Sequence, residues 1–174
     1  MRLPNDIDIH SHSGAVSKDR IVCVDPTETK CLPEGDGYLS VGIHPWNADK
    51  ADDDAWERMA EWLADPRVIA VGEAGYDKLR GPSPEIQDEV FGRQVEMCSQ
   101  TGLPLIIHCV RAIDKLLDKR KNNSGQWILH GFRGKPEQAR QLLDKGIDLS
   151  YGSKYNPASF SLTPPERLYR ETDN

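Results

Sequence analysis

The chain opens with the stretch IDIHSHS, residues 7–13, in which strand-forming residues carry two histidines two positions apart. In a β-strand, residues i and i+2 point to the same side, so His10 and His12 direct two imidazoles at one point, with Asp8 on the same face. Two imidazolium rings would repel each other, whereas two neutral rings can bind one cation between them. The stretch therefore predicts a strand that ends in metal ligands.

Similar apolar runs recur along the chain, and each ends in a polar residue or a glycine. Several of these runs are continuously apolar, which is typical of parallel strands that are buried on both faces. Together with the first run they predict strands at residues 7–12, 21–24, 38–45, 68–75, 104–109, 126–132, 148–152 and 167–172.

Amphipathic helical patterns separate the later strands. The expected helices cover residues 55–65, 84–102, 112–120 and 135–146. Alternating strands and helices indicate an α/β fold with a parallel sheet, and eight strands predict a (β/α)8 TIM-type barrel, which usually has about 250 residues. This chain is shorter because three connections rich in proline or glycine contain little helix, at residues 13–20, 25–37 and 154–166. We therefore expect a single compact barrel domain over residues 1–174, with several helices shortened or missing.

The composition narrows the class of protein. A formal net charge of −6 argues against a protein that coats nucleic acid with a wide basic surface, although a local phosphate site stays open. No run approaches the roughly 18 consecutive apolar residues of a membrane helix. The four cysteines form no C-x-x-C pair. We expect a cytoplasmic protein with reduced thiols, no membrane association and no obligate protein partner.

All five histidines lie at or near the carboxyl ends of expected strands: His10, His12, His44, His108 and His130. In a parallel barrel those ends meet at one rim, which is the rim that carries active sites. Two acids share these positions, Glu73 between two glycines in VGEAG and Asp173 after the last strand. A buried glutamate needs a partner. An ion pair with Arg or Lys is one explanation for Glu73, and a metal shared with the histidines explains more of the pattern.

Six motifs follow one another in the order of the expected strands: HSH at 10–12, GIHPW at 42–46, VGEAG at 71–75, LIIHC at 105–109, LHGFRG at 129–134 and ETD at 171–173. This series resembles the signature of the TatD family, metal-dependent deoxyribonuclease-like hydrolases of the amidohydrolase-type barrel group. The resemblance implies that His10 and His12 hold one metal ion with Asp173, and that Glu73 bridges to a second ion. His108 and His130 would complete the second site, and His44 would lie near the substrate.

The chain departs from the family pattern at three places. HCVRA stands where the family has HSRDA, which brings Cys109 and Arg111 to the loop after the fifth strand, and HGFRG stands where the family favours HCFSG, which brings Arg133 to the rim. The sequence also stops at Asn174, directly after Asp173, whereas the family continues with a closing helix. Either this is a truncated version, or a short member closes its barrel by other means.

The expected ligand set suits two divalent ions, with Zn²⁺, Mn²⁺ and Mg²⁺ as the candidates. A metal-activated water would be the nucleophile. Asp173 would steer that water or accept its proton, and Glu73 would hold the two ions at a fixed separation. Trp46, beside the histidine of GIHPW, is a candidate for stacking on a base, with a packed rim tryptophan as the alternative.

Positive side chains near the rim are candidates for phosphate binding. Arg111, Arg133 and Lys154 each follow an expected strand, and Arg80 lies in the loop after VGEAG. Each one alone is better explained as a solvated surface charge, whereas three on separate rim loops would cradle a phosphate against an acidic body.

Three functions stay open on the sequence. The first is hydrolysis of phosphodiester bonds in DNA or a short oligonucleotide. The second keeps the same site but cleaves an amide, ester or lactone of a small molecule. The third is a catalytically silent family member that binds a metal or a partner.

Overall fold

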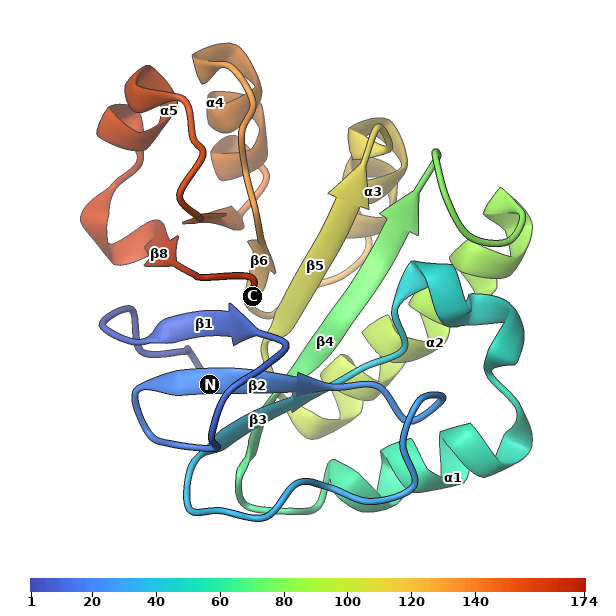
Figure 1. Ribbon diagram of the computed structural model, residues 1–174. Coiled ribbons are helices and arrows are strands. Elements are labelled where there is room, and N and C mark those ends of the chain that lie inside the picture. Colours follow the sequence, from blue (N-terminus) through green and yellow to red (C-terminus); the bar gives the residue numbers. More distant parts are fainter.

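The computed structural model describes residues 1–174 and closes eight parallel strands into a barrel in which neighbours follow sequence order (Figure 1). The strands are β1 (Asp8–Ser11), β2 (Arg20–Val24), β3 (Tyr38–Val41), β4 (Val68–Asp77), β5 (Leu105–Val110), β6 (Trp127–Leu129), β7 (Ile147–Tyr151) and β8 (Leu168–Arg170). Strand β8 pairs with β1 through Asp8 and Arg170, which closes the ring. The predicted (β/α)8 barrel is confirmed.

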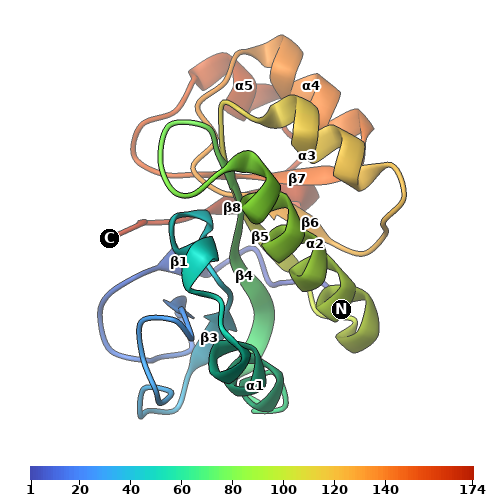
Figure 2. The same cartoon turned by 90° about the vertical axis from the view of Figure 1, so that its right-hand side faces the viewer.

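The helices cover the barrel unevenly. They are α1 (Asp53–Trp62), α2 (Pro84–Thr101), α3 (Ile113–Arg120), α4 (Pro136–Asp144) and α5 (Pro157–Leu162), with short 3₁₀ helices η1 (Pro45–Lys50) and η2 (Pro165–Arg167). No helix joins β1 to β2 or β2 to β3, so loops alone lie on that side, as Figures 1 and 2 show. The expectation of missing and shortened helices is therefore confirmed. None of the helices has the length and apolar character that a membrane crossing requires.

Local sequence signals explain where the helices begin and end. The Asp52 carboxylate accepts the backbone N–H of Ala55 at 2.8 Å, which caps α1. Pro84 stands in the first turn of α2, and Gly102 ends that helix at φ 71°, a conformation that costs glycine little. Strand β3 ends at Val41 and not at the predicted residue 45, because the chain turns into η1, which begins at Pro45.

Two apolar clusters form the core. The larger one packs the outer faces of the strands against the helices, and includes the buried Trp56, Trp62 and Trp127. The smaller one draws residues from six strands, so it fills the barrel interior: Leu3, Ile9, Ile21, Ala70, Ile106, Ile128 and Tyr169.

This interior layer positions the polar residues above it. Because alternate residues of a strand point to the same side, the residue two positions after an interior one also faces inward. His108 therefore follows Ile106 and His130 follows Ile128 at the carboxyl ends of β5 and β6. The apolar layer supports the base of the histidine cluster.

Candidate metal centre

Two irregular strand pairings aim the first ligands at the barrel axis. Val71 of β4 pairs with Leu105 and Ala74 with Ile107, so three steps along β4 match two along β5 around Glu73. The pairing of β1 with β2 shifts in the same way between Asp8 and Ser11, around His10. Such bulges redirect a side chain next to a functional site.

The glycines beside Glu73 allow the close approach of β4 to β5. A Cβ on Gly72 would lie 2.5 Å from the carbonyl oxygen of Ile106, and one on Gly75 would lie 1.9 Å from that of His108. Both glycines also have φ near +150°, at 141° and 151°. Larger residues would push the Glu73 strand away from the histidine strands.

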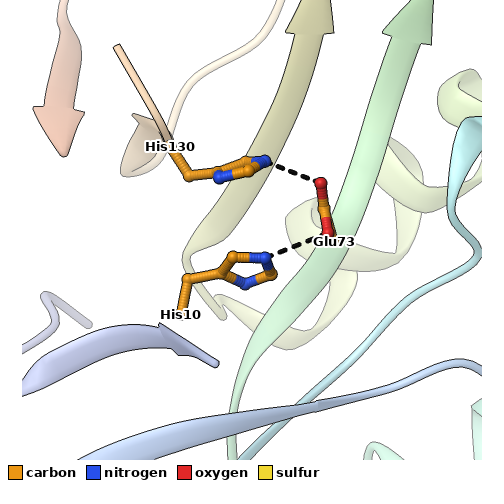
Figure 3. Close-up of side chains that lie close together, drawn as sticks. All are labelled: His10, Glu73 and His130. Carbon is orange, nitrogen blue, oxygen red and sulfur yellow. Dashed lines mark hydrogen bonds and ion pairs between the residues drawn. The ribbon is translucent and has the colours of Figure 1, made fainter. Parts of the chain in front are cut away.

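All five histidines surround one carboxylate. The ring nitrogens of His108 and His130 lie 2.7 and 2.6 Å from Glu73 Oε1. On the other side, Nε2 of His10 and of His12 lie 3.0 and 3.2 Å from Oε2. His44 Nε2 is 3.4 Å from Oε1. Figure 3 shows His10 and His130 lying next to each other and pointing at Glu73 from the same side, one ring at each carboxylate oxygen.

Glu73 is 2% exposed and keeps a negative charge. Burial alone would raise the pKa of Glu73, but the charge of His130 and the close ring nitrogens of His10 and His108 hold it well below the ordinary value. Its Oε2 atom has no hydrogen-bond partner, although two ring nitrogens lie within 3.2 Å of it. The atoms converge on a shared point rather than on one another, which is the arrangement of ligands around a cation.

His108 and His130, which we call the braced pair, each contact a second carboxylate. His108 Nε2 lies 3.0 Å from Asp77 Oδ2, and His130 Nδ1 lies 3.2 Å from Glu171 Oε1. A carboxylate can only accept, so these nitrogens carry the hydrogen and leave the other nitrogen of each neutral ring free to bind a cation next to Glu73.

In the metal-free protein, a proton on His130 takes the place of the cation next to Glu73. Burial opposes a charged ring, but the carboxylates of Glu73 and Glu171 outweigh it and raise the pKa of His130 well above its usual value. Burial likewise acts to raise the pKa of Glu171, and its contact with His130 reverses that effect, so the pKa of Glu171 is lowered.

His10 and His12, which we call the β1 pair, have no such support. Their Nε2 atoms are 3.1 Å apart, and both face Asp173 Oδ1, at 3.5 and 3.6 Å. The buried Nδ1 of His10 has no partner, and burial lowers the pKa of that ring. Asp173 and Glu73 raise the pKa of His12 to about 9. Two ring nitrogens facing each other need a shared proton or metal ion to be stable.

Asp173 reaches the centre from the segment after β8. Its backbone N–H donates to the carbonyl oxygen of His10 at 3.0 Å, and its φ of 51° turns the chain at this point. The contact with His12 is the main cause of the lowered pKa of Asp173. Asp8 braces the same segment by accepting from the backbone and hydroxyl of Thr172, rather than pointing at the histidines.

The centre lies at the bottom of a pocket of about 450 Å³. Four acids line it, namely Asp25, Glu28, Glu73 and Asp173, and no lysine or arginine does. The positive charge that the lining itself can offer is therefore limited to its histidines. The residue groups close enough to share an ion include His10–Glu73–His130, His10–His12–Asp173 and His44–Glu73–His108.

His44 is suited to donate rather than to ligate. Its Nδ1 accepts the backbone N–H of Trp46 at 3.1 Å, so the hydrogen sits on Nε2, which faces the Glu73 carboxylate. Its backbone N–H donates to Asp25 Oδ2 at 3.0 Å, which fixes the turn.

Trp46 lies at the edge of the pocket and is 39% exposed. Its indole Nε1–H donates to Asp77 Oδ2 at 2.8 Å, and the Arg80 guanidinium covers the ring at 3.8 Å from its centre. Burial would raise the pKa of Asp77, but hydrogen bonds from Trp46 and His108 lower it, so Asp77 is a carboxylate.

The other expected substrate contacts lie outside the pocket lining. Arg111, Arg133 and Lys154 are exposed and make no hydrogen bond or ion pair. Sequence reasoning missed the two bracing acids. The available signal was position, because Asp77 ends the strand that holds Glu73 and Glu171 begins the ETD motif.

Comparison with known proteins points in one direction. A model of the family described as TatD related DNase matches residues 27–174. The protein of Mycobacterium tuberculosis named "Uncharacterized metal-dependent hydrolase TatD" is 34% identical over 151 residues, which cover 78% of this chain and 57% of that protein. The "3'-5' ssDNA/RNA exonuclease TatD" of Cronobacter turicensis is 30% identical over 149 residues, which cover 78% of this chain and 56% of that protein.

A solved structure agrees on the fold. The crystal structure of YJJV, a TatD homologue from Escherichia coli K12, matches with a TM-score of 0.80 at 24% identity and covers 97% of this chain and 79% of that chain. This chain spans about half the length of the curated relatives that it matches.

Proposed function

The chain belongs to the TatD related DNase family, and from that premise we propose that it is a divalent-metal-dependent hydrolase that cleaves phosphodiester bonds of DNA or short oligonucleotides. One observation carries the proposal: a single buried carboxylate, that of Glu73, has ring nitrogens of all five histidines within 3.4 Å. Five imidazolium rings gathered around one carboxylate would repel one another, so neutral rings around bound cations are the stable form.

We propose two divalent ions, as the resemblance to the family implies. His10, His12 and Asp173 would hold one ion, His108 and His130 would hold the other, and Glu73 would contribute to both. The partnerless Oε2 of Glu73 supports this reading, because it faces His10 and His12 without a hydrogen bond to either. Mixed nitrogen and oxygen ligands favour Zn²⁺ or Mn²⁺ over Mg²⁺.

When bound, such ions lower the pKa of a coordinated water toward neutrality and stabilise the negative charge that develops on a phosphodiester. The chain's own residues supply the rest. Asp173 is 39% exposed at the pocket and is a carboxylate, so its Oδ1 can accept the proton of the attacking water. Glu73 fixes the distance between the two histidine pairs. His44 can donate from Nε2 to a substrate oxygen.

The substrate would lie across the pocket mouth. Trp46 offers an exposed ring on which a base can stack. Arg111, Arg133 and Lys154 would bind phosphates further along the nucleic-acid substrate. The relative named a 3'-5' ssDNA/RNA exonuclease makes single-stranded ends the first substrate to test. A cytoplasmic location is part of this proposal, because four free thiols are typical of reducing compartments.

A second candidate is hydrolysis of a small neutral ester, amide or lactone. The observation that favours it is the acidic pocket, whose lining contains no lysine or arginine. A neutral substrate would not be repelled by the four acids there, whereas a phosphodiester depends on the ions for its attraction.

The test begins with protein stripped of metal by a chelator. A labelled single-stranded oligonucleotide and a panel of small esters are then incubated with and without added Mn²⁺ or Zn²⁺, beside the Glu73→Gln variant. We expect metal-dependent cleavage of the oligonucleotide and none by the variant. Cleavage of esters alone would favour the second candidate. Folded protein that binds no metal and cleaves nothing would indicate the silent family member.

A further inference from the structure

Asp77, at the end of β4, accepts from four donors with two oxygens. On Oδ2 it receives Nε2–H of His108 at 3.0 Å and Nε1–H of Trp46 at 2.8 Å. On Oδ1 it receives the backbone N–H groups of Leu79 and Arg80 at 2.8 and 3.1 Å. Asp77 is 5% exposed, so the carboxylate depends on these four donors for most of its hydrogen bonds.

The Oδ1 contacts form a turn that places a rim cation. Accepting the N–H groups two and three residues on fixes the start of the loop after β4. Gln87 of α2 holds the same loop, accepting the N–H of Asp77 at 2.8 Å and donating to the carbonyl oxygens of Asp77 and Arg80 at 3.0 and 3.2 Å. The loop delivers the Arg80 guanidinium to the face of Trp46 at 3.8 Å.

We propose that Asp77 is a positioning residue that joins the metal centre to a stacking platform made of Trp46 and Arg80. One carboxylate would set the His108 ring so that Nδ1 faces Glu73, and would hold the platform beside it. The platform's role in binding bases rests on the proposed function. The positioning of both rings does not, because it follows from hydrogen bonds alone.

Only a carboxylate satisfies all four donors. In an Asp77→Asn variant one oxygen becomes an NH₂ group, which must face two N–H groups wherever it points. If it faces the loop, the turn that carries Arg80 is lost. If it faces the rings, Nε2 of His108 must become an acceptor, and the hydrogen moves to Nδ1, the nitrogen that a metal ion would need.

Glu171 provides a matched control within the same centre. It contacts His130 as Asp77 contacts His108, but its second oxygen accepts from Ser150 and it has no contact with Trp46. A Glu171→Gln variant should therefore disturb a histidine of the braced pair while leaving the platform unchanged.

The experiment compares wild type, Asp77→Asn and Glu171→Gln by two measurements. Zn²⁺ affinity is measured by calorimetry on protein stripped of metal, and hydrogen exchange of the Trp46 indole Nε1–H is followed by NMR, with Trp46→Phe to assign the signal. Where its NH₂ group faces the rings, Asp77→Asn should bind Zn²⁺ about 10–100-fold more weakly, the usual cost of losing a group that orients a metal ligand, and should speed the exchange of the indole hydrogen. Where the NH₂ group faces the loop, it should instead speed the exchange of the Leu79 and Arg80 backbone N–H groups, which the same NMR measurement follows. Glu171→Gln should leave all three of these hydrogens as protected as in the wild type.

The inference is overturned if Asp77→Asn, with a wild-type circular dichroism spectrum, keeps wild-type Zn²⁺ affinity, a protected indole hydrogen and protected backbone N–H groups at Leu79 and Arg80. Should the variant not fold, ¹⁵N NMR of wild-type protein loaded with Zn²⁺ decides. A hydrogen on Nε2 of His108 supports the inference, and one on Nδ1 overturns it. None of these readouts uses hydrolysis, so a protein that cleaves no oligonucleotide would refute the proposed function and leave this inference standing.

Discussion

The braced pair and the β1 pair face the same carboxylate, but they are held differently. His108 and His130 are 13% and 8% exposed, and each is fixed at its second ring nitrogen by a buried acid. His12 is 47% exposed, and the buried Nδ1 of His10 has no partner. The acid that completes the β1 pair, Asp173, lies after β8 rather than on a strand.

This difference follows the architecture. Strands β4 to β7 are backed by helices, whereas loops alone join β1, β2 and β3 (Figure 1). Ligands that are already oriented lose less freedom on binding, so the braced pair should hold an ion tightly and the β1 pair more weakly. The comparison therefore predicts two unequal metal sites that share Glu73.

The largest effect is expected at Glu73, the carboxylate that the braced pair and the β1 pair share. Glu73→Gln keeps the size of the side chain but removes the only charge that both histidine pairs face. Oligonucleotide hydrolysis should fall by more than about 100-fold, beyond the loss caused by removing an orienting group, and both ions should be weakened in a Zn²⁺ titration. A variant that loses one ion only would show that Glu73 does not join the two halves.

The next largest effect should distinguish the braced pair from the β1 pair. His108→Ala should weaken the tighter ion, whereas His12→Ala should weaken only the looser one and leave the tighter ion near its wild-type affinity. Calorimetric Zn²⁺ titrations of the two variants, with a melting curve for each as the control for folding, measure this. Equal losses in the two variants would remove the distinction between the pairs.

A pH effect of moderate size is expected from the β1 pair alone. Asp173 and Glu73 raise the pKa of His12 to about 9 in the folded protein, from an unfolded value of about 6.5. This contribution to stability is complete below pH 6.5 and is lost as the pH rises through 9. Half of the ring is exposed, so solvent and salt reduce the effect.

Urea unfolding of metal-free protein between pH 6 and pH 10 tests this expectation, with His12→Gln as the reference. The wild type should lose stability relative to the variant as the pH rises. Because both proteins contain His130, the contribution of His130 cancels in the difference between them. In Asp173→Asn the decline should begin at lower pH, because the larger cause of the shift is gone. Parallel curves for wild type and His12→Gln would refute the shifted titration.

The sequence predicted the barrel well because its signals are local. Apolar strand runs that alternate with amphipathic helices, and helix ends such as Gly102, are visible in single segments. It also brought the histidines to one rim, since parallel strand ends meet there. It could not predict that Asp77 and Glu171 brace the two rings, because those contacts depend on bulges and on which way a loop turns. For the same reason Arg80, a surface charge in the sequence, lies on Trp46 in the structure.

The smallest effect concerns the rim, where Arg133 follows β6 and His130 but makes no hydrogen bond or ion pair of its own. If it binds a phosphate, Arg133→Ala should raise the KM for an oligonucleotide by less than about fivefold, because an exposed ion pair contributes at most about 1 kcal/mol. The kcat should not change, and the difference should shrink between 50 and 200 mM salt as screening grows. Arg140→Ala, an exposed arginine on α4, controls for net charge. An equal rise in KM for a neutral ester would mean that Arg133 acts on the shape of the rim and not on phosphate.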